Sequence, residues 1–269
     1  MWFRNQWSVV VVVLLLTGGS RLRAQGESRD PKAVEVTRAM MKAMGGEEAW
    51  NSTHFVRFDF KFKLDGKLLA DNAHLWDRKD GRYRFEQTTN DGKRQVVLFR
   101  IGDYERDKAG EAYLDGKKLE GDAARKAVDD AYGSYINDSW WLCMPWKWFA
   151  SGVNLKYLGP QKHGGETADV VELTFGHVGL TPGDMYHAFV SQKSHLMDYW
   201  EYTLSEHSPV KQKKGAWDWQ YGDYKGVKLA SNHVSSDHKA TINMGDVRVL
   251  DAVDDAFFAD ASQSLAGLK

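Results

Sequence analysis

Apolar and polar residues alternate along the chain between residues 54 and 63. The even positions, among them Phe58, Phe60 and Phe62, are mostly apolar, and the odd positions are mostly polar. Successive side chains of a strand point to opposite faces, so this pattern predicts a half-buried strand. Short turn signals then separate further strands and predict an antiparallel meander over residues 54–101. The signals are Asp65-Gly66, Asp80-Gly81 and Asn90-Asp91-Gly92, and the strands are expected at 68–76, 82–88 and 94–101.

Helical patterns come before and after this meander. Asp30 followed by Pro31 predicts a helix start, and Gly45-Gly46 predicts its end. A second helical composition begins after Gly121. The triplet at residues 137–139 is predicted to break that helix and to cap a new one over residues 140–149. This last segment holds four tryptophans and is apolar on all sides, so it is expected to be buried.

Strand patterns resume after the apolar segment. Strands are predicted at 154–158, 168–175, 185–191, 197–205, 216–224, 227–234 and 241–250, with turns at 180–184 and 224–226. Short strands at this spacing are typical of a barrel or a sandwich. We therefore expect a mainly β fold. Its core is a single, strongly curved antiparallel sheet, an open or incomplete β-barrel. An N-terminal helix precedes the sheet, and a helical plug or lid is inserted between two blocks of strands.

The first residues have the pattern of a secretory signal peptide. One arginine precedes an unbroken apolar run at residues 9–16, and a cleavage site is expected after Ala24. That run is shorter than the roughly 20 residues that a membrane-spanning helix needs. The chain has one cysteine, Cys143, far from this region, so no lipid anchor is expected there. We predict a signal peptide at residues 1–24, a single domain at 25–269, and export to the periplasm.

Composition narrows the classes of function. The formal net charge is −1, and the predicted leader holds three arginines and no acid, so the mature chain is more acidic still. This balance argues against nucleic-acid binding. The nine histidines form no ligand motif, so no metal or cofactor is expected, and His233 and His238 are expected to be exposed beside a turn. Cys143 lies among apolar residues and is expected to be buried and unreactive. No nucleophile motif is present, and we expect no enzymatic activity.

Aromatic residues are the chain's most informative feature, with 11 Trp, 11 Tyr and 12 Phe. They can be ordinary core packing, or they can form the wall of an apolar ligand cavity. Trp217, Trp219 and Tyr221 alternate and are expected to share one strand face. The candidate ligand-binding residues are Trp76, Phe85, Phe99, Trp140, Trp141, Met144, Trp146, Trp148, Phe175, Trp200 and Trp219.

Several stretches resemble exported proteins related to the outer-membrane lipoprotein carriers, the LolA/LolB-like fold. They are residues 44–51, 75–78 with 81–84, 137–147 and 178–184, and they are spread over most of the predicted mature chain. The resemblance implies a curved sheet whose helices cap an apolar cavity that holds acyl chains. We also expect a monomeric protein with peripheral or no membrane contact. Its expected partners are a hydrophobic small molecule or lipoprotein acyl chain and an envelope protein. A family turn of the type Asp-x-x-Thr-Gly-Leu corresponds to residues 191–196, where His195 replaces the glycine.

Two other classes of function remain open at this stage. A glycan-binding or envelope-scaffolding module would use exposed tryptophans as stacking platforms, whereas a carrier would bury them. A carboxylate-dependent hydrolase would place a pair of acids on the inner wall of the sheet. Glu86, Glu172 and Glu201 lie in predicted strands and are the candidates for such a pair.

Overall fold

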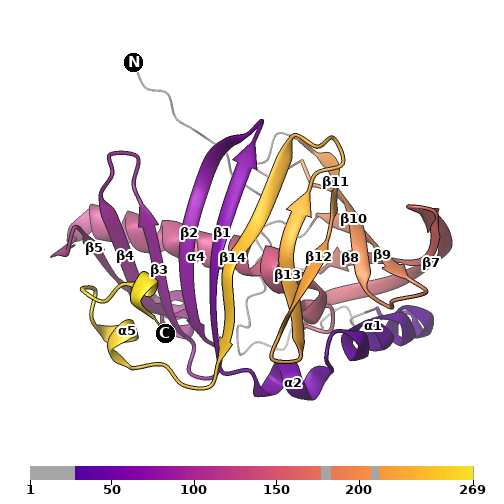
Figure 1. Cartoon of the computed structure of the whole chain (residues 1–269), viewed down its shortest axis with the longest axis horizontal. Helices are drawn as coiled ribbons and strands as arrows, with labels where there is room; N and C mark the ends of the chain where they lie inside the picture. The colour runs from indigo at the N-terminus through magenta and orange to yellow at the C-terminus, as the bar shows by residue number, and fades with distance from the viewer. Residues whose placement is uncertain (1–27, 177–182, 207–211, 269) are drawn as a thin grey trace.

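The protein is built from two antiparallel sheets with helices on both sides (Figure 1). This computed structural model describes residues 28–176, 183–206 and 212–268. The predicted signal peptide and most of the predicted turn at 180–184 lie outside the described residues. The sequence predicts a single sheet, and this is wrong. The hydrogen-bond pattern divides the strands into two sheets, one of nine strands and one of five. No closed barrel forms among the strands of the described ranges.

The larger sheet brings the first and the last strands of the chain together. Its order is β12-β13-β14-β1-β2-β3-β4-β5-β6, so β1 pairs with both β2 and β14. The strands are β1 (Phe55–Leu64), β2 (Lys67–Asp77), β3 (Arg82–Thr88), β4 (Arg94–Arg100), β5 (Glu111–Leu114), β6 (Lys117–Lys118), β12 (Gln220–Tyr224), β13 (Val227–Val234) and β14 (Ala240–Leu250). The predicted meander is confirmed, while β5 and β6 were not predicted.

The smaller sheet is a second meander, in the order β11-β10-β9-β8-β7. Its strands are β7 (Val153–His163), β8 (Glu166–Phe175), β9 (Met185–Ser191), β10 (Met197–Thr203) and β11 (Lys214–Asp218). The turn between β9 and β10 contains His195 at φ 56°, the left-handed conformation that the family's glycine would take there. The Ser191 hydroxyl accepts hydrogen bonds from the backbone N–H groups of Lys193 and Ser194.

The two sheets meet at Trp219, where the predicted strand at 216–224 is interrupted. β11 ends at Asp218 on the smaller sheet, and β12 begins at Gln220 on the larger one. The Trp219 N–H still donates to the Asp198 carbonyl at 2.8 Å, whereas Gln220 already pairs with β13. The chain therefore changes partners within two residues, which alternation alone does not reveal.

The N-terminal helix α1 (Pro31–Ala43) has the predicted ends. The Asp30 side chain accepts a hydrogen bond from the Lys32 N–H at 2.7 Å, which caps the first turn. After it, Gly45 takes φ 118° against the turn between β12 and β13, where a Cβ would lie 2.0 Å from the Gly226 carbonyl oxygen. The short helix α2 (Glu47–Ser52) follows and was not predicted.

Helix α4 (Gly121–Cys143) is the longest helix and is continuous through residues 137–139. The predicted break is wrong because the polar side chains of this triplet are buried against the sheet and do not cap a new helix. The 3-10 helix η1 (Met144–Lys147) extends α4 by one turn. In Figure 1, α4 runs behind the sheet, and α5 (Ala256–Ala259) lies in front of it. The remaining helices are α3 (Ile101–Asp107) and η2 (Leu265–Gly267).

Two apolar clusters fill the space between the helices and the inner faces of the sheets. We call the strand face that carries Val56, Phe58 and Phe60 the inner face. The larger cluster joins this face, the inner face of the smaller sheet, α1 and the segment from Trp140 to Trp148. The smaller cluster lies where β3 and β4 pack against α3 and the first part of α4. None of the helices in the described ranges is both long and apolar enough to cross a bilayer.

Candidate functional site

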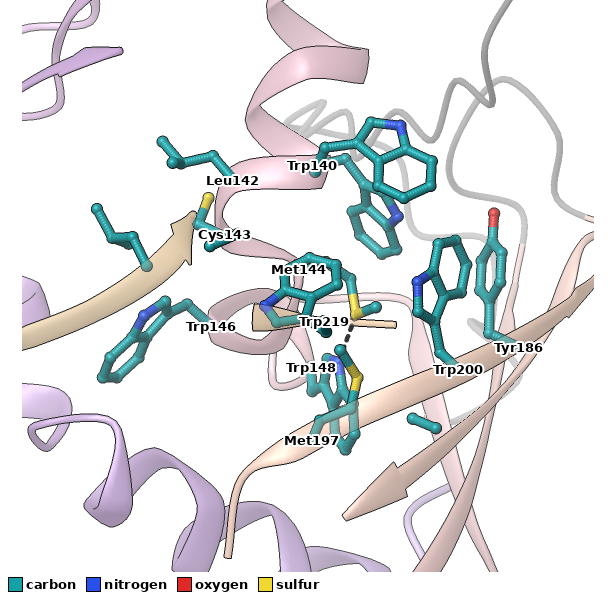
Figure 2. Close-up of a cluster of buried hydrophobic side chains, with 14 of the residues drawn as sticks. Trp140, Leu142, Cys143, Met144, Trp146, Trp148, Tyr186, Met197, Trp200 and Trp219 are labelled. Atoms are coloured by element: carbon teal, nitrogen blue, oxygen red, sulfur yellow. Dashed lines mark hydrogen bonds between the residues drawn. The ribbon is translucent and has the colours of Figure 1, made fainter. Parts of the chain in front are cut away.

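The aromatic segment at the end of α4 lies inside the larger cluster (Figure 2). Trp140, Trp141 and Trp148 are at most 1% exposed. Trp148 donates its indole N–H to the Met144 sulfur at 3.0 Å, and Trp146 donates to the Lys228 carbonyl at 3.0 Å. The segment is thus tied to itself and to β13 by few polar contacts and otherwise held by apolar packing.

The smaller sheet and the sheet junction supply the facing wall. Trp141 makes edge-to-face contacts with Trp200, Trp217 and His233 at ring distances of 5.3, 5.0 and 5.1 Å. Trp140 contacts the Tyr186 ring at 5.9 Å. Such aromatic pairs stabilise a contact beyond the area that they bury. The segment and the wall therefore form one continuous aromatic body, which we call the aromatic core.

The structure brings most of the predicted candidate residues together, but not all. Eight lie in the aromatic core: Trp140, Trp141, Met144, Trp146, Trp148, Phe175, Trp200 and Trp219. Phe85 and Phe99 belong to the smaller cluster, because β3 and β4 pack on the first part of α4. Trp76 is half-buried and contacts both clusters. The stripe of Trp217, Trp219 and Tyr221 packs on the aromatic core, although the strand break separates its ends.

Four buried indole groups in the aromatic core lack an acceptor. Within residues 28–176, 183–206 and 212–268, the N–H groups of Trp140, Trp141, Trp200 and Trp219 have no hydrogen-bond partner, and each side chain is at most 2% exposed. An unpaired buried donor costs about 1–3 kcal/mol relative to a paired one. The aromatic core is therefore densely packed with rings, but four of its hydrogen-bond donors are unpaired. Periodicity predicts burial of these residues but does not reveal the unpaired donors.

A buried polar network ties α4 to the sheet next to this core. The Asp138 carboxylate accepts hydrogen bonds from Asn72 at 2.8 Å and Asn137 at 2.8 Å, and it lies 2.9 Å from His74 Nε2. The other His74 nitrogen is 2.9 Å from the Tyr83 hydroxyl. This network is not predicted from the sequence. Its signal was the polar triplet at 137–139 inside an otherwise apolar helix.

His233 is buried, which corrects the expectation of an exposed turn residue. Its two ring nitrogens lie 2.9 Å from the Trp141 carbonyl and 3.3 Å from the Asp218 carbonyl. Burial lowers its pKa to about 4, so the ring is neutral at pH 7. His233 thus links the aromatic segment to the point where the two sheets meet. His238 is exposed, as expected.

The described residues do not fit the glycan-platform alternative. Among the tryptophans of the described residues, Trp76 alone is more than 9% exposed, and even its side chain is half-buried. A stacking platform for sugars needs exposed rings. The tryptophans here face one another instead.

The carboxylates weighed for hydrolysis lie away from the aromatic core. Glu86, Glu172 and Glu201 each follow an inner-facing residue on their strand and so project from the outer face. Arg84 Nε donates to Glu86 at 2.6 Å, and Glu172 lies 3.2 Å from His187. The predicted pair of acids on the inner wall is therefore not formed by these three residues.

A charged groove lies on the outer face. It has a volume of about 490 Å³ and is lined by charged residues of β1, β2, β3, β4 and β14 and by the C-terminal segment. Arg84 is fully buried beside it and donates to the backbone carbonyls of Phe257 and Asp260. The arginines of this region thus hold the end of the chain against the sheet.

One group of side chains has the proximity that a metal site requires. Ligand atoms of His54, Asp77 and Asp80 lie within 4.8 Å of one another. Asp77 accepts hydrogen bonds from two backbone N–H groups and from Arg82 Nε at 2.7 Å. Both of its oxygens are thus engaged, and the arginine beside them opposes a second cation. These residues do not form a convincing metal centre.

Comparison with known proteins gives structural matches. No family model matches the chain. No curated protein matches it either. Solved structures with a similar arrangement include a DUF1329 family protein from Desulfovibrio piger, with 11% identity, a TM-score of 0.45, and coverage of 88% of this chain and 99% of that one. A LolA-superfamily protein from Nitrosomonas europaea matches with 10% identity, a TM-score of 0.46, and coverage of 84% and 96%.

A third match is a putative outer-membrane lipoprotein-sorting protein domain from Vibrio parahaemolyticus. It has 10% identity and a TM-score of 0.44, and the match covers 84% of this chain and 96% of that one.

Proposed function

We propose that this protein is a non-catalytic binding protein for an apolar ligand, such as an acyl chain, in the periplasm. The ligand enters between the segment Trp140–Trp148 and the inner faces of the two sheets. The proposal takes residues 1–24 as a signal peptide and residues 25–269 as one monomeric domain. Its main support is the aromatic core, where one segment contributes large rings to a wall that both sheets complete.

The unpaired indole donors support a core that can open. Four buried N–H groups without acceptors destabilise the closed arrangement relative to a fully paired one. A ligand that inserts beside them offers apolar surface, whose burial contributes about 25 cal/mol per Å². A lipid ester or acid carbonyl also offers an acceptor. Displacement of the aromatic segment therefore exchanges one set of apolar contacts for another at modest cost.

Cys143 provides a built-in reporter for this displacement. It is the chain's only cysteine, it is 1% exposed, and its thiol donates to the Ser139 carbonyl at 3.0 Å. Burial also raises the pKa of the thiol, which makes it less reactive. We expect slow reaction with a thiol-specific aromatic disulfide in the free protein. Adding hexadecanoate below its micelle concentration should accelerate the reaction at least about tenfold.

Binding itself is tested by native mass spectrometry and by tryptophan fluorescence during the same titration. Adjacent residues of β10 give a matched pair of variants, since Trp200 is buried in the aromatic core and Tyr199 packs on the opposite face. Trp200→Leu should weaken binding and Tyr199→Leu should not. The proposal fails if the protein carries no lipid, its fluorescence ignores hexadecanoate and Cys143 stays unreactive.

A further inference from the structure

Two cations that form no ion pair with the described residues lie at the rim of the aromatic core, Arg78 and Lys147. Arg78, directly after β2, donates to the backbone carbonyls of Trp50 and Thr53. Its guanidinium lies 3.5 Å from the Trp50 ring centre and 5.5 Å from that of Trp76. Arg78 Nε is buried and has no hydrogen-bond acceptor. The side chain is thus positioned by carbonyls and rings, which leave its charge uncompensated.

Lys147 is the second cation, at the end of η1. Its ammonium donates to the Ser139 hydroxyl at 3.1 Å and lies 5.8 Å from the Trp140 ring centre. In the described part of the chain, no carboxylate forms an ion pair with Lys147 or with Arg78. Both side chains are half-buried, so solvent still reaches this place.

The two cations lie along one face of helix α4. Tyr135, Ser139 and Cys143 recur every four residues and therefore share one face of the helix. At one end of this face, Tyr135 contacts the Trp76 ring at 5.7 Å, next to Arg78. At the other end, Ser139 and Cys143 lie beside Lys147. The two charges thus border the same helix face.

The electrostatics of the pair favour an anion. Burial lowers the pKa of Lys147, and the positive charge of Arg78 lowers it further. Burial also lowers the pKa of Arg78. Two like charges in a partly desolvated place destabilise each other, and a carboxylate or phosphate between them removes that cost. Charge-assisted hydrogen bonds to such a group are about twice as strong as neutral ones.

We propose that Arg78 and Lys147 bind the anionic headgroup of the ligand whose chain occupies the aromatic core. This inference rests on the proposed function. The headgroup is a carboxylate or a phosphate, held between a guanidinium that Trp50 positions and an ammonium at the end of η1. The ligand class is then an anionic amphiphile, and a neutral lipid is disfavoured.

Three probes with the same chain test this assignment: hexadecanoate, hexadecyl phosphate and hexadecanol, each titrated against tryptophan fluorescence below its micelle concentration. We expect at least one anionic probe to bind about tenfold or more tightly than hexadecanol. Tighter binding of hexadecyl phosphate indicates a phospholipid-type headgroup, and tighter binding of hexadecanoate indicates a free fatty acid.

Matched variants separate charge from fold. Lys147→Met should remove most of the preference for anionic probes. Lys126→Met, on the exposed face of α4, should leave that preference as it is in the native chain. Arg78→Gln should act like Lys147→Met, with Arg106→Gln as its exposed control. If Arg78→Gln does not fold, Lys147→Met alone decides.

The outcomes distinguish this inference from the proposed function. If hexadecanol binds as tightly as the anionic probes, or if Lys147→Met keeps the preference, the headgroup site is refuted while apolar binding stands. If none of the three probes binds, the proposed function itself fails.

Discussion

His74 Nε2 on β2 and Asp138 Oδ2 on α4 lie 2.9 Å apart in a place that is closed to solvent, where His74 is 0% and Asp138 2% exposed. This pair is one of the polar contacts that join the longest helix to the larger sheet, together with the contacts of Asn72 to Asp138 and of His233 to the Trp141 carbonyl. The contact holds this turn of α4 against β2, beside the aromatic core.

Removing the carboxylate should destabilise the fold strongly. Asp138→Ala leaves buried donors of Asn72 and Asn137 without an acceptor and should lower the free energy of unfolding by about 3–5 kcal/mol. Urea denaturation followed by circular dichroism measures it. Asp130→Ala, at an exposed position of the same helix, should cost less than about 0.5 kcal/mol. Equal costs would show that the network adds nothing.

Stability should fall with acidity through His233. Its folded pKa is about 4 and its reference value 6.5, so between these values the unfolded chain binds a proton that the folded chain does not. Stability therefore rises with pH across this window, by up to about 3 kcal/mol from this residue. His233→Gln should flatten that part of the pH profile relative to the native chain. His238→Asn, at an exposed position, should leave it unchanged, and an unaltered slope in His233→Gln would contradict the assignment.

Gly45 should tolerate no side chain. A Cβ at this position would meet the Gly226 carbonyl oxygen at 2.0 Å, so Gly45→Ala must separate α1 from the turn between β12 and β13. We expect a loss of about 3 kcal/mol in unfolding free energy. Its neighbour Gly46 has φ 91° and open space around it, so Gly46→Ala tests backbone strain alone and should cost about 1–2 kcal/mol. Chemical denaturation of both variants compares the cost of the steric clash at residue 45 with the cost of backbone strain alone at residue 46.

Arg84 should hold the C-terminal segment in place. It donates to the carbonyls of Phe257 at 2.8 Å and Asp260 at 3.0 Å. Arg84→Met should free this segment and raise its rate of limited proteolysis at least about tenfold. Arg100→Met removes an exposed arginine that donates to the Asp80 carbonyl and serves as the control. Cleavage at the native rate in Arg84→Met would show that other contacts retain the segment.

The sequence by itself determined the local elements. The alternation from residue 54 onward defined β1, and paired turn residues such as Asp65 and Gly66, with φ 48° and 77°, defined its hairpin. The cap at Asp30 defined the start of α1. These features depend on neighbours within a few residues, so periodicity and turn chemistry suffice to predict them.

The tertiary structure decided what depends on distant partners. Asp138 continues α4 because Asn72 and His74 satisfy it from β2, although its sequence context is typical of a helix break. The predicted strand at 216–224 divides because its two halves find partners in different sheets. Burial of an aromatic was predictable from its neighbours along the chain. Contacts between residues dozens of positions apart decide which rings share a core and which cations lie at its rim.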